Sequence, residues 1–437
     1  MNKCKIGIVG FGTVGKGIYK ILKNTKDNHP ILQEIEIVNI VVKDLTKKRE
    51  LNTEKGLLID DSDLLINNPS IDVIVEVMGG TDLAKEVILK SLNAGKSVVT
   101  ANKAVMARYG DEIYAKANSK GVYVLFEAAV CGGIPIIEPI KRSFKSNQIN
   151  KMTGIINGTT NFILSKMSKE LDTFENSLKI AQELGYAELD PTADVRGQDA
   201  ADKISILTEL AFGGKINRNE IDTEGIDKID LKDISYANKL GFEIKLLAVS
   251  EKMNTSKEGS LSLNTWVGPT LIHKNHPLAS VEGVNNAILV EGDPIGEIML
   301  YGPGAGSGPT AASVVADLLN LKAISFKNNI NNLEDIDPLL SFNFWRKCHL
   351  VPNDNIRKKN YLRIICHDSP GVIGKIGQIF GENGVSIESI VQLDARENEA
   401  EIVVITHKVT NGNINNSKEQ LNSLPEVQLI ASQLNCI

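Results

Sequence analysis

A glycine-rich turn near the start of the chain constrains the fold more than any other feature. The apolar run Ile6–Val9 leads directly into Gly10-Phe-Gly-Thr-Val-Gly15, and the pattern over Val14–Leu22 is that of a helix. Glycines at this spacing allow a tight turn and a close approach of the backbone to a pyrophosphate, which the helix N-terminus then faces. Because the motif stands between a strand and a helix, a dinucleotide-binding turn is favoured over an ordinary glycine turn.

Short apolar runs alternate with helical patterns as far as residue 126. The runs, rich in valine and isoleucine, are Lys5–Val9, Ile35–Val42, Val73–Val77, Ser97–Thr100 and Val122–Phe126. Strands that alternate with helices are typical of a parallel sheet with crossover helices. The sequence therefore predicts an α/β protein that begins with a Rossmann dinucleotide-binding domain over residues 1–130.

The pattern changes beyond residue 130. Strand-like segments (151–156, 244–249, 261–267 and 286–291) are mixed with long helices such as Thr173–Leu184 and Gln198–Phe212, with an extended loop expected before the second of these. We expect an α+β second domain over residues 131–325. The Asn- and Asp-rich residues 326–358 are expected to form a connector.

The C-terminal residues 359–437 follow another pattern. A strand, a helix, two strands, a helix and a strand succeed one another, as in the ferredoxin-like βαββαβ motif. With its own alternating strands, this segment is expected to fold by itself. A chain that ends near Val351 is then expected to stay soluble and active.

The residues after the second predicted strand bear on the choice of cofactor. An acidic residue about twenty positions beyond the glycines usually binds the ribose 2′-hydroxyl of NAD. Here the strand is followed by Lys43 and Asp44 and then by the basic run Lys47–Arg49. A cation at this position favours a 2′-phosphate and therefore NADP. NAD stays as the alternative, with the basic loop merely solvated.

Ligands of open parallel sheets bind beyond the carboxyl ends of the strands, which is where Thr100 and Lys103 stand. Further along, Asp199 and Lys203 lie at positions i and i+4 of a predicted helix and share one face. The alternatives to catalysis are a solvated lysine at the start of a helix and an exposed helical ion pair. The residues alone do not decide between these interpretations.

Acid–base chemistry in this chain is expected to fall to lysine or a carboxylate. The six histidines lie away from the segments named above and form no metal-binding set. A lysine can act as a general acid when burial or a second cation lowers its pKa from about 10.4 towards neutrality. A second glycine-rich segment, Tyr301–Thr310, indicates another close approach of the backbone or a mobile loop.

Composition excludes several classes of partner. Lys and Arg number 48 and Asp and Glu 54, a net charge of -6, so no general basic field is present to attract nucleic acid. The apolar runs are far shorter than the roughly 18 residues of a membrane span, so no membrane partner is expected. Five scattered cysteines, an odd number, indicate a reducing, cytoplasmic location.

Several segments taken together resemble the homoserine dehydrogenase family. They run in the family's order: Gly10–Gly15, Val99–Ala104, Phe126–Val130, Asn157–Asn161, Leu184–Pro191 with Asp199 and Lys203, and Tyr301–Gly306. The segments Asp368–Phe380 and Gly384–Ile387 are similar to an ACT domain, a module that commonly binds amino-acid effectors. No aspartokinase-like segment precedes the first strand, so a monofunctional enzyme is expected.

The resemblance implies an activity and its regulation. The expected reaction is the NAD(P)H-dependent reduction of L-aspartate 4-semialdehyde to L-homoserine, in the biosynthesis of threonine, methionine and isoleucine. Feedback through the ACT domain is expected, with threonine as the first candidate effector. A homo-oligomer, dimer or tetramer, is also implied. Residues 131–325 are then expected to form the catalytic and dimerisation domain, with helix 310–320 packed back on the first domain.

The resemblance assigns roles residue by residue. Catalysis is expected from Lys203, Lys103 and Asp199, and substrate binding from Glu188, Asp199 and Thr159. Cofactor binding is expected from Gly10, Phe11, Gly12, Thr13, Val14, Gly15, Lys43, Thr100, Lys103, Gly185, Glu188 and Gly302. A sodium ion is expected at Glu127, Val130, Gly132 and Ile134, since a carboxylate and backbone carbonyls suit a hard cation.

One departure and two alternatives accompany the resemblance. Many relatives have arginine where this chain has Lys43, which keeps the charge but loses the bidentate fork for a phosphate. The nearer alternative is a dehydrogenase of another amino-acid aldehyde. The other is a non-catalytic amino-acid-sensing protein with a vestigial Rossmann fold, against which the presence of Glu188, Asp199, Lys203 and Lys103 argues.

Overall fold

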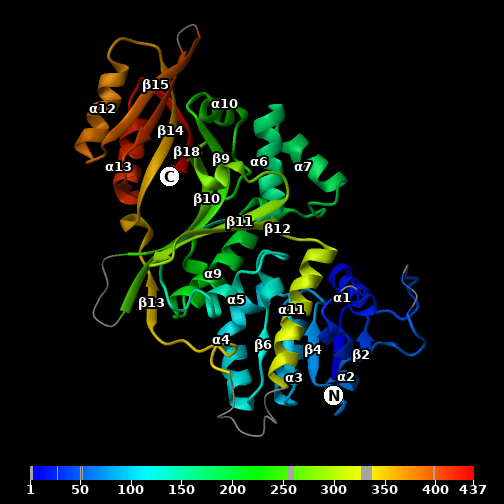
Figure 1. Ribbon diagram of the computed structural model, residues 1–437. Helices are drawn as coiled ribbons and strands as arrows, with labels where there is room; N and C mark the ends of the chain where they lie inside the picture. The colour runs from blue at the N-terminus through cyan, green and yellow to red at the C-terminus, as the bar shows by residue number, and fades with distance from the viewer. Residues whose placement is uncertain are drawn as a thin grey trace. The chain divides into compact units, whose positions relative to one another are not determined.

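The structure, a computed structural model, describes residues 3–26, 28–49, 51, 53–253, 260–325, 337–396 and 399–437 (Figure 1). It divides into two compact units, each made of segments that are discontinuous in sequence. Unit 1 comprises Met1–Asn150, Asp202–Arg218 and Val290–Cys348, and unit 2 comprises Lys151–Ala201, Asn219–Leu289 and His349–Ile437. Of the expected connector, residues 326–336 lie outside the described residues.

Unit 1 is built on a six-stranded parallel sheet. Its strands are β1 (Cys4–Val9), β2 (Ile35–Val41), β3 (Leu58–Ile59), β4 (Val73–Glu76), β5 (Ser97–Thr100) and β6 (Val124–Leu125), in the order β3-β2-β1-β4-β5-β6. The strands are nearly continuous apolar runs because both faces of the sheet are covered. This strand order is that of a Rossmann fold, so the predicted α/β fold is confirmed.

Helices cover the sheet of unit 1. They are α1 (Thr13–Lys23), α2 (Ser62–Ile66), α3 (Asp82–Asn93), α4 (Lys103–Lys120), α5 (Ile137–Lys141) and α11 (Ser307–Ser325), and β12 (Gly296–Pro303) precedes α11. Figure 1 shows α11 beside α1. The two helices touch at Gly17, where a Cβ would lie 2.4 Å from the Ser307 carbonyl oxygen. Val314 and Leu318 of α11 are fully buried in the same core as Ile6.

Unit 2 contains a long mixed sheet. Its strands, in spatial order, are β11 (Asn285–Asp293), β7 (Gln148–Ile155), β9 (Phe242–Lys252), β10 (Ser260–His273), β18 (Val427–Cys436), β14 (Arg357–His367), β16 (Glu399–Thr406) and β15 (Ile387–Arg396). The long hairpin of β9 and β10 runs antiparallel from Leu263 opposite Lys252 to His273 opposite Phe242. Short strands β8 (Asp222–Thr223), β13 (Lys347–Leu350) and β17 (Val409–Thr410) complete the described strands.

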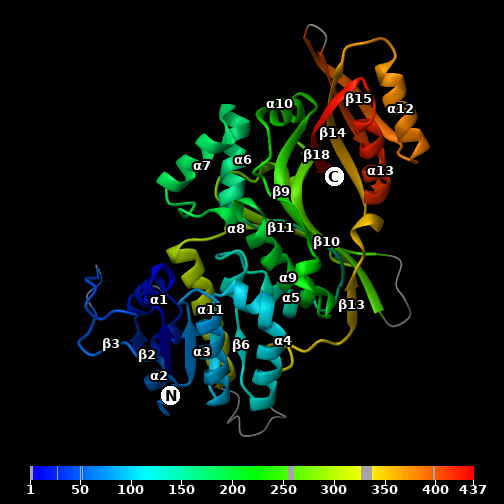
Figure 2. The ribbon, with the colours of Figure 1, turned by 180° about the vertical axis from the view of Figure 1, so that it is seen from behind.

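The predicted βαββαβ motif is confirmed as β14-α12-β15-β16-α13-β18. Its helices, α12 (Val372–Glu382) and α13 (Asn411–Asn422), lie on the same face of the sheet in Figures 1 and 2. Thr270 and Leu271 of β10 pair in parallel with Asn435 and Cys436 of β18. The motif is therefore continuous with the sheet of unit 2.

The remaining helices of unit 2 flank the long hairpin or precede α9 (Gln198–Phe212). They are α6 (Gly158–Glu170), α7 (Phe174–Glu183), α8 (Thr192–Val195) and α10 (Leu231–Lys239). Helix α9 begins in unit 2 and continues in unit 1. The extended loop expected before α9 is wrong in part, because Thr192–Val195 form the single turn of α8. Asp190 starts this turn, since its Oδ1 accepts a hydrogen bond from the Thr192 amide at 3.1 Å.

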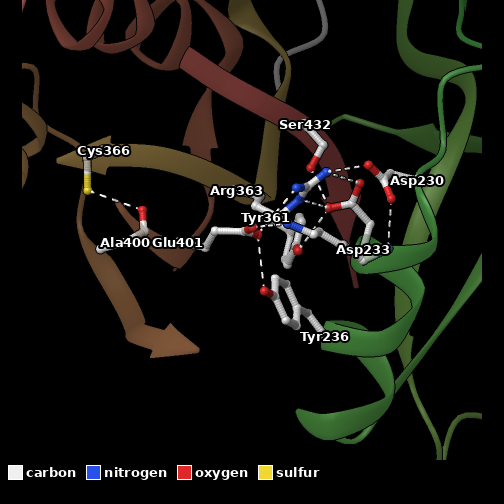
Figure 3. A network of polar contacts seen from close by, with 10 residues as sticks. Asp230, Asp233, Tyr236, Tyr361, Arg363, Cys366, Ala400, Glu401 and Ser432 are labelled. Atoms are coloured by element: carbon white, nitrogen blue, oxygen red, sulfur yellow. Dashed lines mark hydrogen bonds and ion pairs between the residues drawn. The ribbon is translucent and has the colours of Figure 1, made fainter. Parts of the chain in front are cut away.

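A buried ionic cluster joins α10 to the βαββαβ motif (Figure 3). At its centre, Arg363 of β14 is 3% exposed and binds Asp233 of α10, which is fully buried. Arg363 Nη1 also lies 3.4 Å from Glu401 Oε2 of β16. The cluster also includes Tyr236, Tyr361, Ser432, Asp230 and Lys232.

Among the helices that the structure describes, none has the length and apolarity to cross a bilayer.

Candidate functional site

The glycine turn of unit 1 has the geometry that a dinucleotide requires. Gly10 has φ +111°, and its amide donates to the Val41 carbonyl at 3.0 Å. A Cβ on Gly10 would lie 2.6 Å from the Val77 carbonyl oxygen, and one on Gly15 would lie 2.2 Å from that of Gly10. A Cβ on Gly12 would meet no protein atom within 4 Å. The outer glycines are thus needed for packing, and the space beside Gly12 is available to a pyrophosphate.

A buried carboxylate organises the carboxyl ends of β4 and β5. Glu76 is fully buried, and its Oε2 accepts a hydrogen bond from Thr100 Oγ1 at 2.6 Å while its Oε1 accepts from the Met78 amide at 2.9 Å. Burial raises the pKa of Glu76, and these two hydrogen bonds oppose the rise. Asn102 donates to the Gly80 carbonyl at 2.7 Å and caps α4, which begins at Lys103. Thr100 is therefore held at the end of β5, and Lys103 follows at the start of α4.

The basic loop after β2 is held by its own hydrogen bonds. Asp44 Oδ1 accepts from the amide and the hydroxyl of Thr46 at 2.7 and 2.6 Å, and these bonds lower the pKa of Asp44. Arg49 donates to the carbonyls of Asp44 and Lys47 at 2.7 and 2.9 Å. Lys43 is exposed at the end of the strand. The Lys43 side chain is thus exposed to solvent, whereas the hydrogen bonds of Arg49 hold the conformation of the loop.

In unit 2, a buried asparagine brings two carboxylates together. Asn157, 5% exposed, donates from Nδ2 to Asp194 Oδ1 at 2.7 Å and to Asp199 Oδ2 at 2.8 Å. Its Oδ1 caps α6 by accepting from the Thr160 amide at 2.8 Å. Two carboxylates beside one amide form an acceptor set that suits an ammonium group.

Helix α9 carries the predicted pair of Asp199 and Lys203 one turn apart. Both side chains are buried, with 4% and 8% exposed. The alternative of an exposed helical ion pair is therefore wrong, because neither side chain is exposed to solvent. The neighbouring Asp202 is bound to Arg218 at 2.6 Å.

The other predicted residues of unit 2 lie on two elements: Thr159 is on α6, and Gly185 and Glu188 lie between α7 and α8. Thr159, 9% exposed, donates to the Tyr186 carbonyl at 2.6 Å. Gly185 has φ +74° and ends α7, a conformation that favours glycine. The Glu188 side chain is exposed, and its backbone carbonyl accepts from Gln182 at 3.0 Å.

The turn expected to bind sodium lies in unit 1 around a buried carboxylate. Glu127, 3% exposed, accepts hydrogen bonds from the amides of Ile136, Ile137 and Glu138 at 2.6, 2.9 and 2.7 Å. Burial raises its pKa despite these three bonds. Asp317 of α11, 1% exposed, accepts from the Glu127 amide at 2.9 Å, and burial and the charge of Glu127 raise its pKa. Two carboxyl groups are thus buried close together.

The second glycine-rich segment approaches the same turn. Cys131 and Gly132 both have positive φ, 55° and 45°. A Cβ on Gly132 would lie 2.6 Å from the Gly304 carbonyl oxygen, and the Gly132 carbonyl accepts from Ser313 Oγ at 2.5 Å. At Gly302 a Cβ would lie 3.4 Å from the side chain of Ile134. The glycine-rich segment therefore approaches another stretch of this chain's backbone closely, at Gly132. The segment then leads directly into α11.

Sequence reasoning missed three buried residues of the site. Glu76 and Asp317 were not singled out, and Asn157 was recognised only as part of a matching segment. Asn157 carries a signal of its own, since an asparagine before Gly-Thr-Thr is typical of a helix N-cap. Nothing in the local sequence distinguishes Asp317 from other acidic residues on helices.

Comparisons with known proteins agree along the whole chain. A family model described as "Homoserine dehydrogenase" matches residues 135–319, one described as "Homoserine dehydrogenase, NAD binding domain" matches residues 10–127, and the ACT domain model matches residues 360–426. A homoserine dehydrogenase from Synechocystis is 48% identical over 428 residues, with 98% of each chain covered.

Solved structures show the same likeness. The crystal structure of a homoserine dehydrogenase from Thiobacillus denitrificans matches with a TM-score of 0.90 at 36% identity, covering 100% of this chain and 99% of that one. A hyperthermophilic archaeal homoserine dehydrogenase in complex with NADPH matches with a TM-score of 0.60 at 27% identity, covering 75% of this chain and 98% of that one.

Proposed function

The chain belongs to the homoserine dehydrogenase family, and we propose that it reduces L-aspartate 4-semialdehyde to L-homoserine with NAD(P)H. The observation that carries the proposal is that one chain has both a turn suited to a dinucleotide and an acceptor set suited to an ammonium group. Unit 1 has a glycine turn with open space beside Gly12. Unit 2 has the carboxylates of Asp194 and Asp199 on Asn157, which suit the ammonium group of an amino-acid substrate.

The proposed chemistry needs one proton donor and one acceptor set. When bound, the nicotinamide supplies a hydride to the aldehyde carbon. Lys203 donates a proton from Nζ to the aldehyde oxygen as negative charge develops there, and solvent restores the proton. Asp199, one turn earlier on α9, accepts the substrate ammonium beside Asp194, and Glu188 is proposed as a further substrate-binding carboxylate. Thr159 is proposed to contact the substrate, and Lys103 to lie between substrate and cofactor.

The cofactor residues proposed in unit 1 begin with the turn Gly10, Phe11, Gly12, Thr13, Val14 and Gly15. Thr100, Lys103, Gly185, Glu188 and Gly302 are the other residues proposed to bind the cofactor. NADP is the proposed preference, supported by exposed Lys43 at the end of β2 and by the NADPH complex of the archaeal relative. Lys43 attracts a 2′-phosphate as a point charge without the bidentate geometry of arginine.

Sodium is proposed at Glu127, Val130, Gly132 and Ile134. The donor set fits a hard cation, since it consists of one carboxylate and backbone carbonyls. The charge of Glu127 raises the pKa of the buried Asp317 carboxyl and that of Lys141 lowers it, so a further cation beside Glu127 would be favoured by the same carboxyl group. Replacing sodium by choline at constant ionic strength should lower the melting temperature, and no change would contradict the assignment.

Regulation, assembly and location complete the proposal. An amino-acid effector, threonine first, is proposed to act through the ACT domain, in a homo-oligomer. A cytoplasmic location is supported by the scattered, odd set of cysteines. Threonine, methionine and isoleucine biosynthesis is the pathway that homoserine would supply.

The test is turnover by the full chain. Homoserine should be oxidised with NADP, and related amino alcohols such as serine should be oxidised far more slowly. Preferred oxidation of another amino alcohol would indicate a dehydrogenase of another amino-acid aldehyde. Cofactor binding without oxidation of any substrate would indicate an amino-acid-sensing protein.

A further inference from the structure

Unit 2 contains a cavity of about 390 Å³ between two parts of the chain that are far apart in sequence. One wall comes from residues 222–229 and from β10, and the other from β14, α13 and β18 of the ACT domain. Cavities for small molecules start at about 300 Å³, so this volume suits a ligand of a few heavy atoms. The cavity lies apart from the segment Asp368–Gly371 at the start of α12, which is absent from its lining.

Charges of both signs line this cavity. Asp222, Glu224 and Lys228 lie on the first wall, Lys358 comes from β14 and Lys418 from α13. Lys358 Nζ lies 3.4 Å from Asp222 Oδ2 and 4.5 Å from the centre of the Trp266 ring, so these two charges largely offset each other.

Glu224 and Lys418 have weaker compensation. Among the described residues, no hydrogen bond reaches the Glu224 carboxylate. Its pKa is raised by burial first and by the charge of Asp222 second, and the charges of Lys228, Lys358 and Lys418 oppose the rise. Lys418 donates from Nζ to the neutral Gln433 Oε1 at 2.7 Å. One carboxylate and one ammonium in the same cavity are therefore available to groups of opposite charge.

We propose that this cavity binds a small α-amino acid in its zwitterionic form. Glu224 accepts from the ligand ammonium, Lys418 donates to the ligand carboxylate, and the amides of Asn415 and Asn435 supply further polar contacts. The proposal rests on the amino-acid regulation proposed above and assigns it a site.

The first wall of the cavity packs directly on the substrate side of unit 2. A Cβ on Gly225 would lie 2.2 Å from the Val195 carbonyl oxygen, and the Ile226 amide donates to that oxygen at 2.8 Å. Val195 immediately follows Asp194, which Asn157 holds together with Asp199. A ligand that draws Glu224 inward would thus act on the backbone that positions both carboxylates. The effect must be reciprocal, so homoserine should change the affinity for the effector by the same factor.

The test is calorimetric titration of the full chain with L-threonine, L-isoleucine, L-methionine, L-lysine and inorganic phosphate. At least one neutral amino acid should bind at one site per chain. Glu224→Gln and Lys418→Gln should each weaken that binding by about ten- to a hundredfold, as expected for losing a charged partner. Asp368→Asn, a matched loss of one exposed carboxylate that does not line the cavity, should leave it unchanged.

Several results would overturn the proposal: no binding of any amino acid, full binding in both cavity variants, loss of binding in Asp368→Asn alone, or tighter binding of phosphate. Threonine resembles homoserine, so the titration is repeated with Asp199→Asn, and loss of binding there would also count against the cavity. Binding is measured without turnover. An inactive chain that binds the amino acid would contradict the proposed function alone, and an active chain that binds none would contradict the cavity alone.

Discussion

The guanidinium of Arg363 holds the carboxylate of Asp233 with two hydrogen bonds, from Nε to Oδ1 at 2.7 Å and from Nη2 to Oδ2 at 3.2 Å. Tyr361 and Ser432 donate to the same Oδ1 at 3.1 and 2.6 Å. Asp233 belongs to α10, and its three partners belong to the ACT domain (Figure 3). A fully buried carboxylate therefore depends on the ACT domain for these four hydrogen bonds.

Arg363→Met should destabilise the full chain by about 3–5 kcal/mol, because it leaves the buried Asp233 carboxylate without its cation. The double variant Arg363→Met/Asp233→Leu should be more stable than Arg363→Met alone, since it removes the uncompensated charge. Urea unfolding measures both. Equal stabilities of the single and double variants would contradict this account of the cluster.

The same contacts alter the expectation for a shortened chain. A chain that ends at Val351 loses every ACT-domain partner of Asp233 and the pairing of β18 with β10 at Thr270 and Leu271. An exposed strand edge and a bare buried charge both favour aggregation. We expect little soluble protein from this chain and a larger soluble yield when it carries Asp233→Asn. A fully soluble, active truncated enzyme would show that the ACT domain is dispensable for folding.

Local patterns predicted the elements, whereas contacts between distant segments were beyond their reach. The glycine turn and the βαββαβ motif were predictable because strand period, helix period and glycine spacing are local properties. In β14, Leu362 and Ile364 face α12 and α13, so the alternating pattern puts Arg363 on the opposite face. A free ferredoxin-like domain would leave that face in water. The packing of α10 buries Arg363 on that face.

Residue pairs of the candidate site were predictable from the sequence only where both residues lie on one element. Asp199 and Lys203 share a helix, and their spacing alone put them on one face. The bond between Glu76 and Thr100, and the bonds from Asn157 to Asp194 and Asp199, join different elements. No periodicity relates such residues, so the carboxylate pair and the anchored end of β5 emerged only with the tertiary structure.

Lys203→Ala should lower kcat for homoserine at least about 100-fold, the usual cost of losing a general acid or base. Lys203→Arg should not restore it, because guanidinium does not release its proton at working pH. Lys179→Ala, which removes a 72% exposed lysine of α7, is the matched control. Steady-state kinetics with a fixed saturating cofactor provides the test, and near-normal kcat in Lys203→Ala would rule out the proposed role.

Lys43→Glu should shift the ratio of kcat/KM values from NADP towards NAD. The exposed ammonium at the end of β2 attracts a 2′-phosphate, and a carboxylate there would repel the phosphate and accept from a ribose hydroxyl. Lys120→Glu makes the same charge change on an exposed lysine at the end of α4 and should leave the ratio unchanged. A wild-type enzyme that already prefers NAD strongly would mean that the basic loop is only solvated.

Glu209 of α9 should make the protein less stable at alkaline pH. This carboxyl is 8% exposed, and burial raises its pKa from 4.5 to about 8, although the Ile216 amide and the Lys215 charge oppose the rise. Between these two pH values the folded chain binds more protons than the unfolded chain, so stability falls as pH rises. The full rise corresponds to a loss of up to about 5 kcal/mol.

Glu209→Gln keeps a neutral group of the same shape and removes this titration. The melting temperatures of the variant and the wild type should be similar near pH 5, where Glu209 is protonated in the folded chain. They should diverge in favour of the variant as pH approaches about 8. Asp111, the other acidic group near Glu209, is bound to Lys215 and has a lowered pKa, so it is deprotonated throughout this range. Parallel melting curves for the two proteins from pH 5 to 8 would show that Glu209 does not titrate there.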